Sequence, residues 1–269
     1  MARTFLITGA SSGIGAQFAR AYAKRGMDLV LVARRLDRLK ALAEELATAH
    51  GIQATCLDAD LGKRDEVHKL VERVHHHKLH IDGLINNAGY SIPQTFAATT
   101  GAHQLDFVEV CVNTPTLLAH AFLNPMLAQG YGRIINVSSM VAFSPGAAGH
   151  TLYPAAKAYM LKFSRSLAAE VAAKGVHVTA LCPGSTESEF MTSNGMAARL
   201  GDTGGHGPGR FQMTAEAVVE AGIRANEKGR EVIITGLANK LAVAAMTYLP
   251  DGLITPLIRW GAAKYALPD

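Results

Sequence analysis

Tyr153 and Lys157 are the first pair of side chains in this sequence whose types and spacing suggest acid–base chemistry. They stand four residues apart in a stretch with helical periodicity, so they share one helix face about one turn apart. A tyrosine with its usual pKa of about 10 is a poor acid or base at neutral pH, but a neighbouring ammonium favours the phenolate and lowers that pKa. The pair alone is also typical of an amphipathic helix whose lysine stem covers apolar surface.

Two serines precede this pair and add a hydrogen-bond donor. Ser138 and Ser139 directly follow the apolar run 133–137, which places them at the carboxyl end of an expected strand, where ligands bind in open α/β sheets. A serine hydroxyl can donate to a substrate carbonyl and polarise it. Together with the glycine loop described next, these serines favour a catalytic interpretation of the tyrosine and the lysine.

A glycine-rich loop near the N-terminus predicts a phosphate site. The segment Thr8-Gly9-Ala10-Ser11-Ser12-Gly13-Ile14-Gly15 follows a short apolar run and precedes a helical pattern. Glycines let the chain turn sharply and bring its amides close to a pyrophosphate, toward which a helix N-terminus directs a partial positive charge. The spacing Gly-x3-Gly-x-Gly differs from the general dinucleotide pattern, but its place between a strand and a helix favours nucleotide binding.

The residues after the second expected strand indicate which nicotinamide cofactor would fit. NAD sites of this kind place a carboxylate on the ribose hydroxyl about 20 residues past the loop, whereas the run 29–33 is followed here by Arg34 and Arg35. A guanidinium can pair with a 2′-phosphate through two hydrogen bonds. Solvated arginines at a helix start are the alternative, but they oppose the helix dipole. The sequence therefore favours NADP(H), with NADPH preferred over NADH.

The elements that position these groups are predicted by short apolar runs, typical of strands, which alternate with helical patterns. Strands are expected at 4–8, 29–33, 53–58, 83–86, 133–137, 176–181 and 231–235, and helices at 14–25, 36–50, 64–76, 105–129, 153–173 and 215–226. This alternation predicts right-handed crossovers and a parallel sheet covered on both faces. We expect an α/β fold in which a single domain holds one doubly wound, seven-stranded parallel sheet of the Rossmann type.

Two segments interrupt the alternation. The glycine-rich segment 185–213 is irregular and is interpreted as a lid that is disordered without ligand. The segment 238–269 is interpreted as a C-terminal helical extension, broken at Pro250 and Pro256 and packed on the domain formed by 1–237. Its apolar run 241–249 favours a homodimer or homotetramer. Attachment to a membrane surface through Lys240, Arg259 and Lys264 is the alternative.

Composition excludes several other classes of protein. The chain has 269 residues, of which 49% are hydrophobic and 18% charged, and this balance excludes a disordered or coiled-coil protein. Aromatic residues make up 6% and the net charge is +4, which disfavours nucleic-acid binding. The apolar run at the N-terminus is too short for a signal peptide, so we expect a cytoplasmic protein without a membrane span.

Cysteines and histidines form no disulfide or metal motif in the sequence. Cys56, Cys111 and Cys182 are far apart in apolar surroundings, and we interpret them as buried free thiols. The consecutive histidines at 75–77, with His80, point in different directions from a helix. We expect no metal, and the Gly-x-Ser-x-Gly elbow of a hydrolase does not occur.

The motifs and their order resemble those of the short-chain dehydrogenase/reductase family from about residue 4 to residue 235. The glycine loop is followed by Asn86-Asn87-Ala88-Gly89, Asn136-Val137-Ser138-Ser139, Tyr153-Pro154-Ala155-Ala156-Lys157 and Pro183-Gly184. The resemblance implies an NADP(H)-dependent oxidoreductase that interconverts a carbonyl and an alcohol by hydride transfer, with the tyrosine as general acid/base. A non-catalytic NADP(H)-binding regulator on the same fold is the alternative. The loop spacing disfavours a sugar-nucleotide epimerase or dehydratase.

The resemblance also implies the catalytic residues Asn113, Ser139, Tyr153 and Lys157. Ser139 lies 14 positions before Tyr153, one more than is usual in the family, so Ser138 and Ser144 are alternatives. Asn113 would kink a helix and hold a water that completes a proton relay through Lys157. The proline at 115 could produce the kink on its own.

The cofactor contacts that the resemblance implies come from the glycine loop, from the ends of four later strands and from the helix that carries the tyrosine and the lysine. They are Gly9, Ser11, Ser12, Gly13, Ile14, Gly15, Arg34, Arg35, Asp60, Leu61, Asn87, Ala88, Gly89, Tyr153, Lys157, Pro183, Gly184 and Thr186. Asp60 would contact the adenine, or it would cap the following helix. Methionines at 191, 196 and 213 and Phe190 favour an apolar, medium-sized carbonyl substrate.

Overall fold

Seven parallel strands form the centre of the molecule. The computed structural model describes residues 2–146, 150–187 and 212–263. Its strands are β1 (Thr4–Thr8), β2 (Asp28–Ala33), β3 (Ala54–Asp58), β4 (Gly83–Asn86), β5 (Gly132–Val137), β6 (Val176–Cys182) and β9 (Val232–Ile234). They lie in the order β3-β2-β1-β4-β5-β6-β9. The order changes direction between β1 and β4, which is where such sheets form a ligand crevice at their carboxyl edge.

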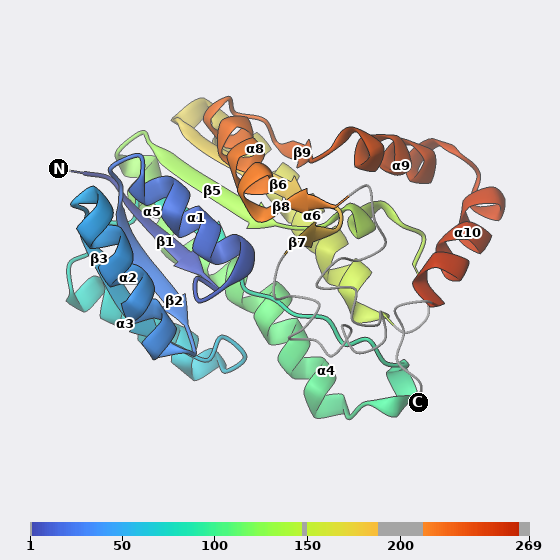
Figure 1. Cartoon of the computed structure of the whole chain (residues 1–269), viewed down its shortest axis with the longest axis horizontal. Helices are drawn as coiled ribbons and strands as arrows, with labels where there is room; N and C mark the ends of the chain where they lie inside the picture. Colours follow the sequence, from blue (N-terminus) through green and yellow to red (C-terminus); the bar gives the residue numbers. More distant parts are fainter. Residues whose placement is uncertain (1, 147–149, 188–211, 264–269) are drawn as a thin grey trace.

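Helices cover both faces of this sheet (Figure 1). One face carries α1 (Gly13–Ala23), α2 (Leu36–His50) and α8 (Ala215–Glu227), and the other carries α3 (Arg64–His76), α5 (Thr114–Ala128) and α6 (Leu152–Val171). Successive strand residues point to opposite faces, so Phe5 and Ile7 join the first apolar layer and Leu6 joins the second. Each face of the sheet therefore has its own buried apolar layer.

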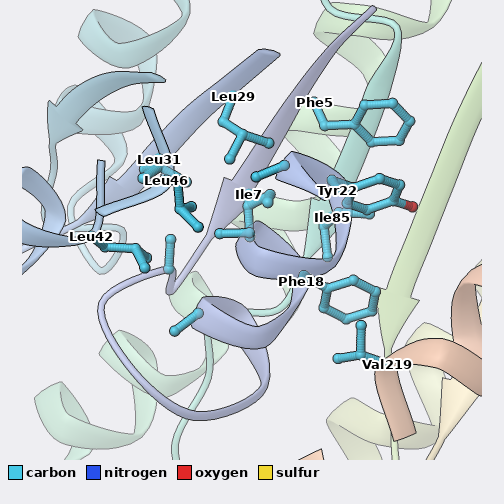
Figure 2. Packing of buried hydrophobic residues seen from close by; sticks show 14 of the residues in the cluster. Phe5, Ile7, Phe18, Tyr22, Leu29, Leu31, Leu42, Leu46, Ile85 and Val219 are labelled. Atoms are coloured by element: carbon cyan, nitrogen blue, oxygen red, sulfur yellow. The ribbon is translucent and has the colours of Figure 1, made fainter. Parts of the chain in front are cut away.

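Aromatic packing fixes α1 over β1. Phe5 and Tyr22 stack with their ring centroids 4.0 Å apart, and Phe18 lies next to Tyr22 (Figure 2). Gly83 in the neighbouring strand leaves room for Phe5, because a Cβ there would overlap the phenyl ring. Since α1 and β1 are held in this way, the glycine loop that joins them has fixed ends.

The structure confirms the expected fold class and alternation. Strand bounds agree with the expected runs to within one residue, and helix bounds agree to within two, apart from the expected helix 105–129. That stretch is divided into α4 (Gly101–Val108), a π-helical turn at Glu109–Asn113 and α5. Pro115 has no amide hydrogen to donate to the carbonyl four residues earlier. The Thr114 amide donates instead to the carbonyl of Glu109, five residues back, which widens the helix locally.

The C-terminal helices extend from the edge strand β9 at one end of the molecule (Figure 1). They are α9 (Leu237–Tyr248) and α10 (Asp251–Ala263), and Val243, Met246 and Ile254 are their buried residues in the cluster that joins them to the domain. The expected break at Pro250 is confirmed. The expected break at Pro256 was wrong, because this proline lies inside α10. It removes one hydrogen bond to the carbonyl of Gly252, which lies on an exposed turn and can bond to water.

The ends of the expected lid are joined by a small sheet. Strands β7 (Thr186–Glu187) and β8 (Met213–Thr214) pair in parallel. The rest of the expected lid, 188–211, lies outside the described residues, with Phe190 and the methionines at 191 and 196. Within the described ranges, no helix is long and apolar enough to cross a membrane, and no group of three metal-ligating side chains is found. The four histidines at 75–77 and 80 are all exposed.

Candidate active site

The candidate site lies at the carboxyl edge of β1, β4, β5 and β6. The glycine loop follows β1, the Asn-Asn-Ala-Gly segment ends β4, and the two serines follow β5. Tyr153 and Lys157 come to the same edge from the first turns of α6. The sheet thus brings together groups that are up to about half of the chain apart in sequence.

Close packing of backbone shapes the glycine loop. Gly9 has a φ of 66° and Gly13 a φ of 54°, conformations that side-chain-bearing residues rarely adopt. A Cβ on Gly15 would collide with the carbonyl of Gly9. Ser12 caps α1 without a side-chain hydrogen bond to its first amides, so these donors are available to an anion.

The segment after β4 braces this loop from behind. The Asn87 Nδ2 donates to the carbonyl oxygens of Thr8 at 3.0 Å and of Gly9 at 3.3 Å. The Thr8 hydroxyl oxygen accepts from the amides of Asn87 and Ala88, both at 3.0 Å. Asn87 and Ala88 therefore act in this structure by holding the loop, next to the place where a pyrophosphate would sit.

Arg35 lies directly over the glycine loop. Its Nη2 donates to the hydroxyls of Ser11 and Ser12, both at 3.0 Å, and its Nε lies 3.3 Å from the Ser11 hydroxyl. Arg34, the neighbouring residue, is exposed. Both arginines follow β2, and they place positive charge at the end of this strand, where a 2′-phosphate could be recognised.

Asp60 and Leu61 follow β3 and organise the turn before α3. The Asp60 Oδ1 accepts from the amide of Gly62 at 3.1 Å, and the Asp60 amide donates to Glu66 at 2.7 Å. The carbonyl of Leu61 accepts from the Thr114 hydroxyl at 2.8 Å. The interpretation of Asp60 as the cap of α3 was wrong, because the N-cap residue is Lys63 and no side chain caps the first amides. The Asp60 carboxylate instead closes the turn before the helix, and its Oδ2 lies 3.8 Å from the Lys63 Nζ as a weak ion pair.

Tyr153, Lys157 and Ser139 are brought together as expected. The Ser139 hydroxyl forms a hydrogen bond with Tyr153, and Lys157 Nζ lies 5.5 Å from the centroid of the Tyr153 ring. Lys157 is 8% exposed, and its Nζ donates to the carbonyl of Val137 at 2.8 Å. A phenol, a hydroxyl and an ammonium thus form one polar cluster at the end of β5.

Burial governs the ionisation of this cluster. It raises the pKa of Tyr153 above the usual value, and the hydrogen bond from Ser139 opposes that rise. Burial also lowers the pKa of Lys157. We expected a neighbouring lysine to bring the pKa of the tyrosine down, but the net shift is upward, because desolvation of the phenolate dominates. The tyrosine is therefore held in its protonated form at neutral pH.

The two alternative serines have structural bonds. The Ser138 hydroxyl donates to the carbonyl of Lys157 at 2.7 Å and so ties β5 to α6. The Ser144 hydroxyl donates to the carbonyl of Val141 at 2.8 Å, within the turn that follows Ser139. Because Ser139 is the serine bonded to Tyr153, the geometry favours it as the third member of the cluster.

Asn113 is the last residue of the π-helical turn, and its side chain bonds within that turn. Its Nδ2 donates to Glu109 at 2.7 Å, and Glu109 also accepts from Arg64 at 3.0 Å. Burial raises the pKa of Glu109, but the hydrogen bonds from Arg64 and Asn113 outweigh it and hold that pKa below the usual range. The Asn113 side-chain amide is thus bonded to the ion pair between Glu109 and Arg64. Residues two positions apart in a helix point to nearly opposite sides. Cys111, two positions before Asn113, is the residue of this turn that lies on the side of Lys157.

The Pro183-Gly184 segment closes the site from β6. The carbonyl of Pro183 accepts from the Met140 amide at 2.9 Å, and the Ser139 hydroxyl lies 3.5 Å from the same oxygen. The Thr186 hydroxyl donates to the carbonyl of Gly184 at 3.1 Å. A Cβ on Gly184 would strike the amide of Asn239 from α9, so the C-terminal extension supports the loop.

Sequence reasoning missed Asn239 and treated Cys111 only as a buried thiol. Asn239 is 8% exposed and its Nδ2 donates to the carbonyl of Thr235 at 2.7 Å. An asparagine in the first turn of an otherwise apolar helix was the signal that could have singled it out. Cys111 lies two residues before Asn113, the asparagine that the resemblance implies. Which of the two side chains points toward Lys157 depends on the geometry of the π-helical turn.

The sequence was also compared with a family model and with known proteins, and the matches include the residues of this site. A family model described as short chain dehydrogenase matches residues 3–198. A short chain dehydrogenase of Pseudocercospora fijiensis is 39% identical over 192 residues, which cover 70% of this chain and 61% of that protein. A 3-oxoacyl-[acyl-carrier-protein] reductase of Aquifex aeolicus is 32% identical over 185 residues, covering 69% of this chain and 74% of that enzyme.

Solved structures match over nearly the whole chain. A short-chain dehydrogenase from Sphingobium yanoikuyae in complex with NADPH superposes with a TM-score of 0.79 at 33% identity, covering 95% of both chains. A bulky-bulky ketone specific alcohol dehydrogenase from Comamonas testosteroni superposes with a TM-score of 0.75 at 31% identity, covering 94% of both.

Proposed function

The chain belongs to the short-chain dehydrogenase family, and from that premise we propose that it is an NADP(H)-dependent oxidoreductase that interconverts a ketone or aldehyde and the corresponding alcohol. The observation that carries the proposal is the cluster of Tyr153, Ser139 and Lys157 beside the glycine loop. The tyrosine is hydrogen-bonded to the serine and the lysine is buried within 5.5 Å of the tyrosine ring. A regulator that only binds a nucleotide has no use for a buried phenol with two such neighbours.

The residues present fit a dinucleotide. Gly9 and Gly15 let the loop fold closely against itself and against Asn87, where a Cβ would clash, and the first amides of α1 are free of side-chain caps. These donors would hold the pyrophosphate. Lys157 would reach the nicotinamide ribose, and the Pro183-Gly184 segment would lie along the nicotinamide side. When bound, the cofactor supplies or accepts the hydride.

The side chains of this protein supply the proton and orient the substrate oxygen. The Ser139 hydroxyl donates to the carbonyl oxygen and polarises it. Tyr153, protonated at neutral pH, gives its proton to that oxygen as an alcohol forms, and it takes the proton back in the reverse direction. Lys157 stabilises the phenolate that remains, because its ammonium lies next to the ring. Because burial raises the pKa of Tyr153, the proton that carbonyl reduction requires is present on the phenol at neutral pH.

Charge at the end of β2 supports NADP(H) over NAD(H). Arg34 and Arg35 stand where an NAD site needs a carboxylate. Arg35 is already placed over Ser11 and Ser12 of the phosphate loop by its hydrogen bonds. A 2′-phosphate there would receive bonds from a guanidinium whose geometry suits it.

Apolar residues near Ser139 support a bulky, apolar carbonyl as substrate. Met140 and Phe143 follow Ser139 in a short 3-10 helix and pack against Val243 and Met246 of α9. The similar structure from Comamonas testosteroni is specific for bulky-bulky ketones. Assays with NADPH against aryl ketones, steroids, 3-oxo esters and short aldehydes test this part of the proposal. A higher kcat/KM for a short aldehyde than for any bulky ketone would contradict it.

The change Tyr153→Phe tests the proposed chemistry. It removes the proton donor and keeps the ring, so we expect kcat to fall below detection while NADPH binding, measured by fluorescence titration, stays near that of the parent. Tyr159→Phe is the matched control, because Tyr159 lies on the same helix and its hydroxyl bonds to Thr116 at 2.8 Å. A Tyr153→Phe variant whose kcat stays within about tenfold of the parent would reject the assignment.

A further inference from the structure

A cavity opens at the amino edge of the sheet, opposite the candidate active site. It has a volume of about 260 Å³ and lies between the end of α3 and the second half of α5, next to the segment that leads into β4. This volume is slightly below the range of about 300–1,000 Å³ that is typical of sites for drug-sized ligands, so the cavity suits a smaller molecule. None of the residues of the candidate active site lines it.

The wall of this cavity is apolar in one part and basic in another. The apolar part consists of Leu79, Ile81, Phe122 and Pro125, and the basic part consists of His75, Lys78 and His80. Ile81 and Phe122 are each 3% exposed, whereas the three basic residues are exposed. The cavity is therefore apolar at its base and carries basic groups at its opening.

The basic groups at the opening have little negative charge near them. Among the described residues, no carboxylate forms an ion pair with Lys78 or His75. The His80 Nε2 lies 3.7 Å from the Oδ1 of Asp82 and donates to the Gln129 Oε1 at 2.8 Å. Asp82 is 7% exposed, and its Oδ2 accepts from a backbone amide of β1 at 2.9 Å. The ammonium of Lys78 is thus left without a counter-charge from the described part of the chain.

Lys78 also has a backbone conformation that favours glycine. Its φ is 51°, and among the described residues it is the single one other than glycine with a positive φ. It terminates α3, because its amide donates to the carbonyl of His75 at 2.9 Å and the Leu79 amide donates to that of Val74 at 3.1 Å. Glycine fills such a position without strain, so a lysine here points to a role for the side chain itself.

A lysine near the end of a helix also has a structural explanation, because its charge interacts favourably with the last carbonyl groups. Two of these carbonyls already accept backbone bonds in α3, which weakens their attraction for a cation and their repulsion of an anion. If the lysine serves the helix alone, its removal should destabilise the protein. If it serves a ligand, replacement by glycine should relieve the backbone and weaken binding. The two explanations therefore predict opposite effects of Lys78→Gly on stability.

We propose that this cavity binds a small amphipathic carboxylate, a molecule with an apolar body and one carboxylate group, and that it is a ligand site separate from the catalytic one. The apolar body packs on Ile81 and Phe122, because this contact removes its surface from water. The carboxylate accepts a charge-assisted hydrogen bond from the Lys78 ammonium. The imidazole of His75 can donate a further hydrogen bond. The proposal does not depend on the proposed function, because the cavity contains no group of the catalytic cluster.

Calorimetric titration of the full chain, saturated with NADPH, tests the class of ligand. The probes are octanoate, its neutral amide octanamide, which has the same body without the charge, and acetate, which has the charge without the body. We expect the Kd of octanoate to be at least about tenfold lower than that of either other probe. An octanamide Kd equal to that of octanoate would overturn the proposal, as would the absence of octanoate binding.

Amide NMR spectra of the full chain, with and without octanoate, test the location of the site. We expect shift changes at residues 75–81, which line the cavity or adjoin it, and none in the glycine loop at residues 9–15. Shift changes confined to the candidate active site would overturn the proposal and leave the proposed function untouched.

The change Lys78→Gly tests the role of the side chain. It removes the ammonium and relieves the backbone, so we expect the Tm to equal or exceed that of the parent while the Kd of octanoate rises by at least about tenfold. Lys69→Ala is the matched control, because it removes the same charge from an exposed position earlier on α3, and its Kd should stay within about twofold of the parent. A Lys78→Gly variant with an unchanged Kd would overturn the proposal, and a lowered Tm in that variant would assign the lysine to helix termination.

Discussion

Burial of the Tyr153 hydroxyl sets the pH at which each direction of the reaction is favoured. Its pKa lies above the usual value, so the phenol is protonated at neutral pH and reduction needs no prior ionisation. Oxidation of the alcohol needs the phenolate, whose fraction rises by up to about tenfold per pH unit below the pKa.

We therefore expect the kcat for alcohol oxidation to increase steadily from neutral pH into the alkaline range, while the kcat for carbonyl reduction stays level. Steady-state rates in both directions across a buffer series measure this. The residual rate of Tyr153→Phe is the reference and should show no such slope. An oxidation rate that peaks at neutral pH would contradict the burial argument.

Arg35 is the residue on which cofactor preference should depend. With its hydrogen bonds to Ser11 and Ser12, it is preorganised for a phosphate next to the loop. We expect NADPH to be preferred over NADH by at least about tenfold in kcat/KM, equivalent to about 1.4 kcal/mol, and Arg35→Ala, combined with Arg34→Ala, to remove that preference without loss of NADH use.

Lys40→Ala is the matched control for these arginines. It removes the same charge from an exposed position further along α2, so the ratio of the two cofactors should not change. Equal use of NADH and NADPH by the parent protein would reject the role of both arginines.

At the level of elements, one asparagine joins α8 to the sheet. Asn226 is 1% exposed, and its Nδ2 lies 3.0 Å from the carbonyl of Ile134, 3.2 Å from that of His177 and 3.0 Å from the Thr179 hydroxyl. These partners belong to β5 and β6, the strands that carry Ser139 and Pro183 at their other ends. The helix and the two strands are therefore linked through one amide group.

We expect Asn226→Ala to lower the free energy of unfolding by about 1–3 kcal/mol, because it leaves buried acceptors without a donor. Urea denaturation followed by circular dichroism measures it. Asn124→Ala, at an exposed position of α5, should change stability by less than about 0.5 kcal/mol. Equal stability of the two variants would show that the amide bonds of Asn226 contribute nothing.

The sequence predicted elements well where periodicity and glycines decide the backbone. Strand β4 was expected at its observed bounds because its apolar run ends at the Asn-Asn-Ala-Gly segment. The π-helical turn was not foreseen, because the apolar pattern continues through it and only Pro115 marks the place. Since a change in helical width rotates every later side chain, the residue that faces Lys157 could not be read from spacing alone.

At the scale of the whole molecule, the C-terminal helices leave apolar side chains exposed. Leu237, Leu241 and Tyr248 of α9, and Leu253 and Leu257 of α10, are each more than 60% exposed. The order of residues in this segment favours an interface between protein surfaces, and we expect a homodimer or homotetramer.

Light scattering on the full chain measures the oligomeric state. The double change Leu241→Ser and Leu253→Ser removes two of these apolar side chains and should lower the association constant without changing the far-ultraviolet spectrum. A monomer that sediments with liposomes would favour the membrane-surface alternative instead.

The position of β1 in the sheet has a consequence for the order in which the protein matures during synthesis. β1 is made first but lies between β2 and β4, and its glycine loop is braced by Asn87, 79 residues after Thr8. At translation rates of about 5–20 residues per second, this brace leaves the ribosome roughly 4–16 seconds after the loop. We therefore expect the loop to gain its braced shape, and the chain to bind a nucleotide, only after β4 has docked.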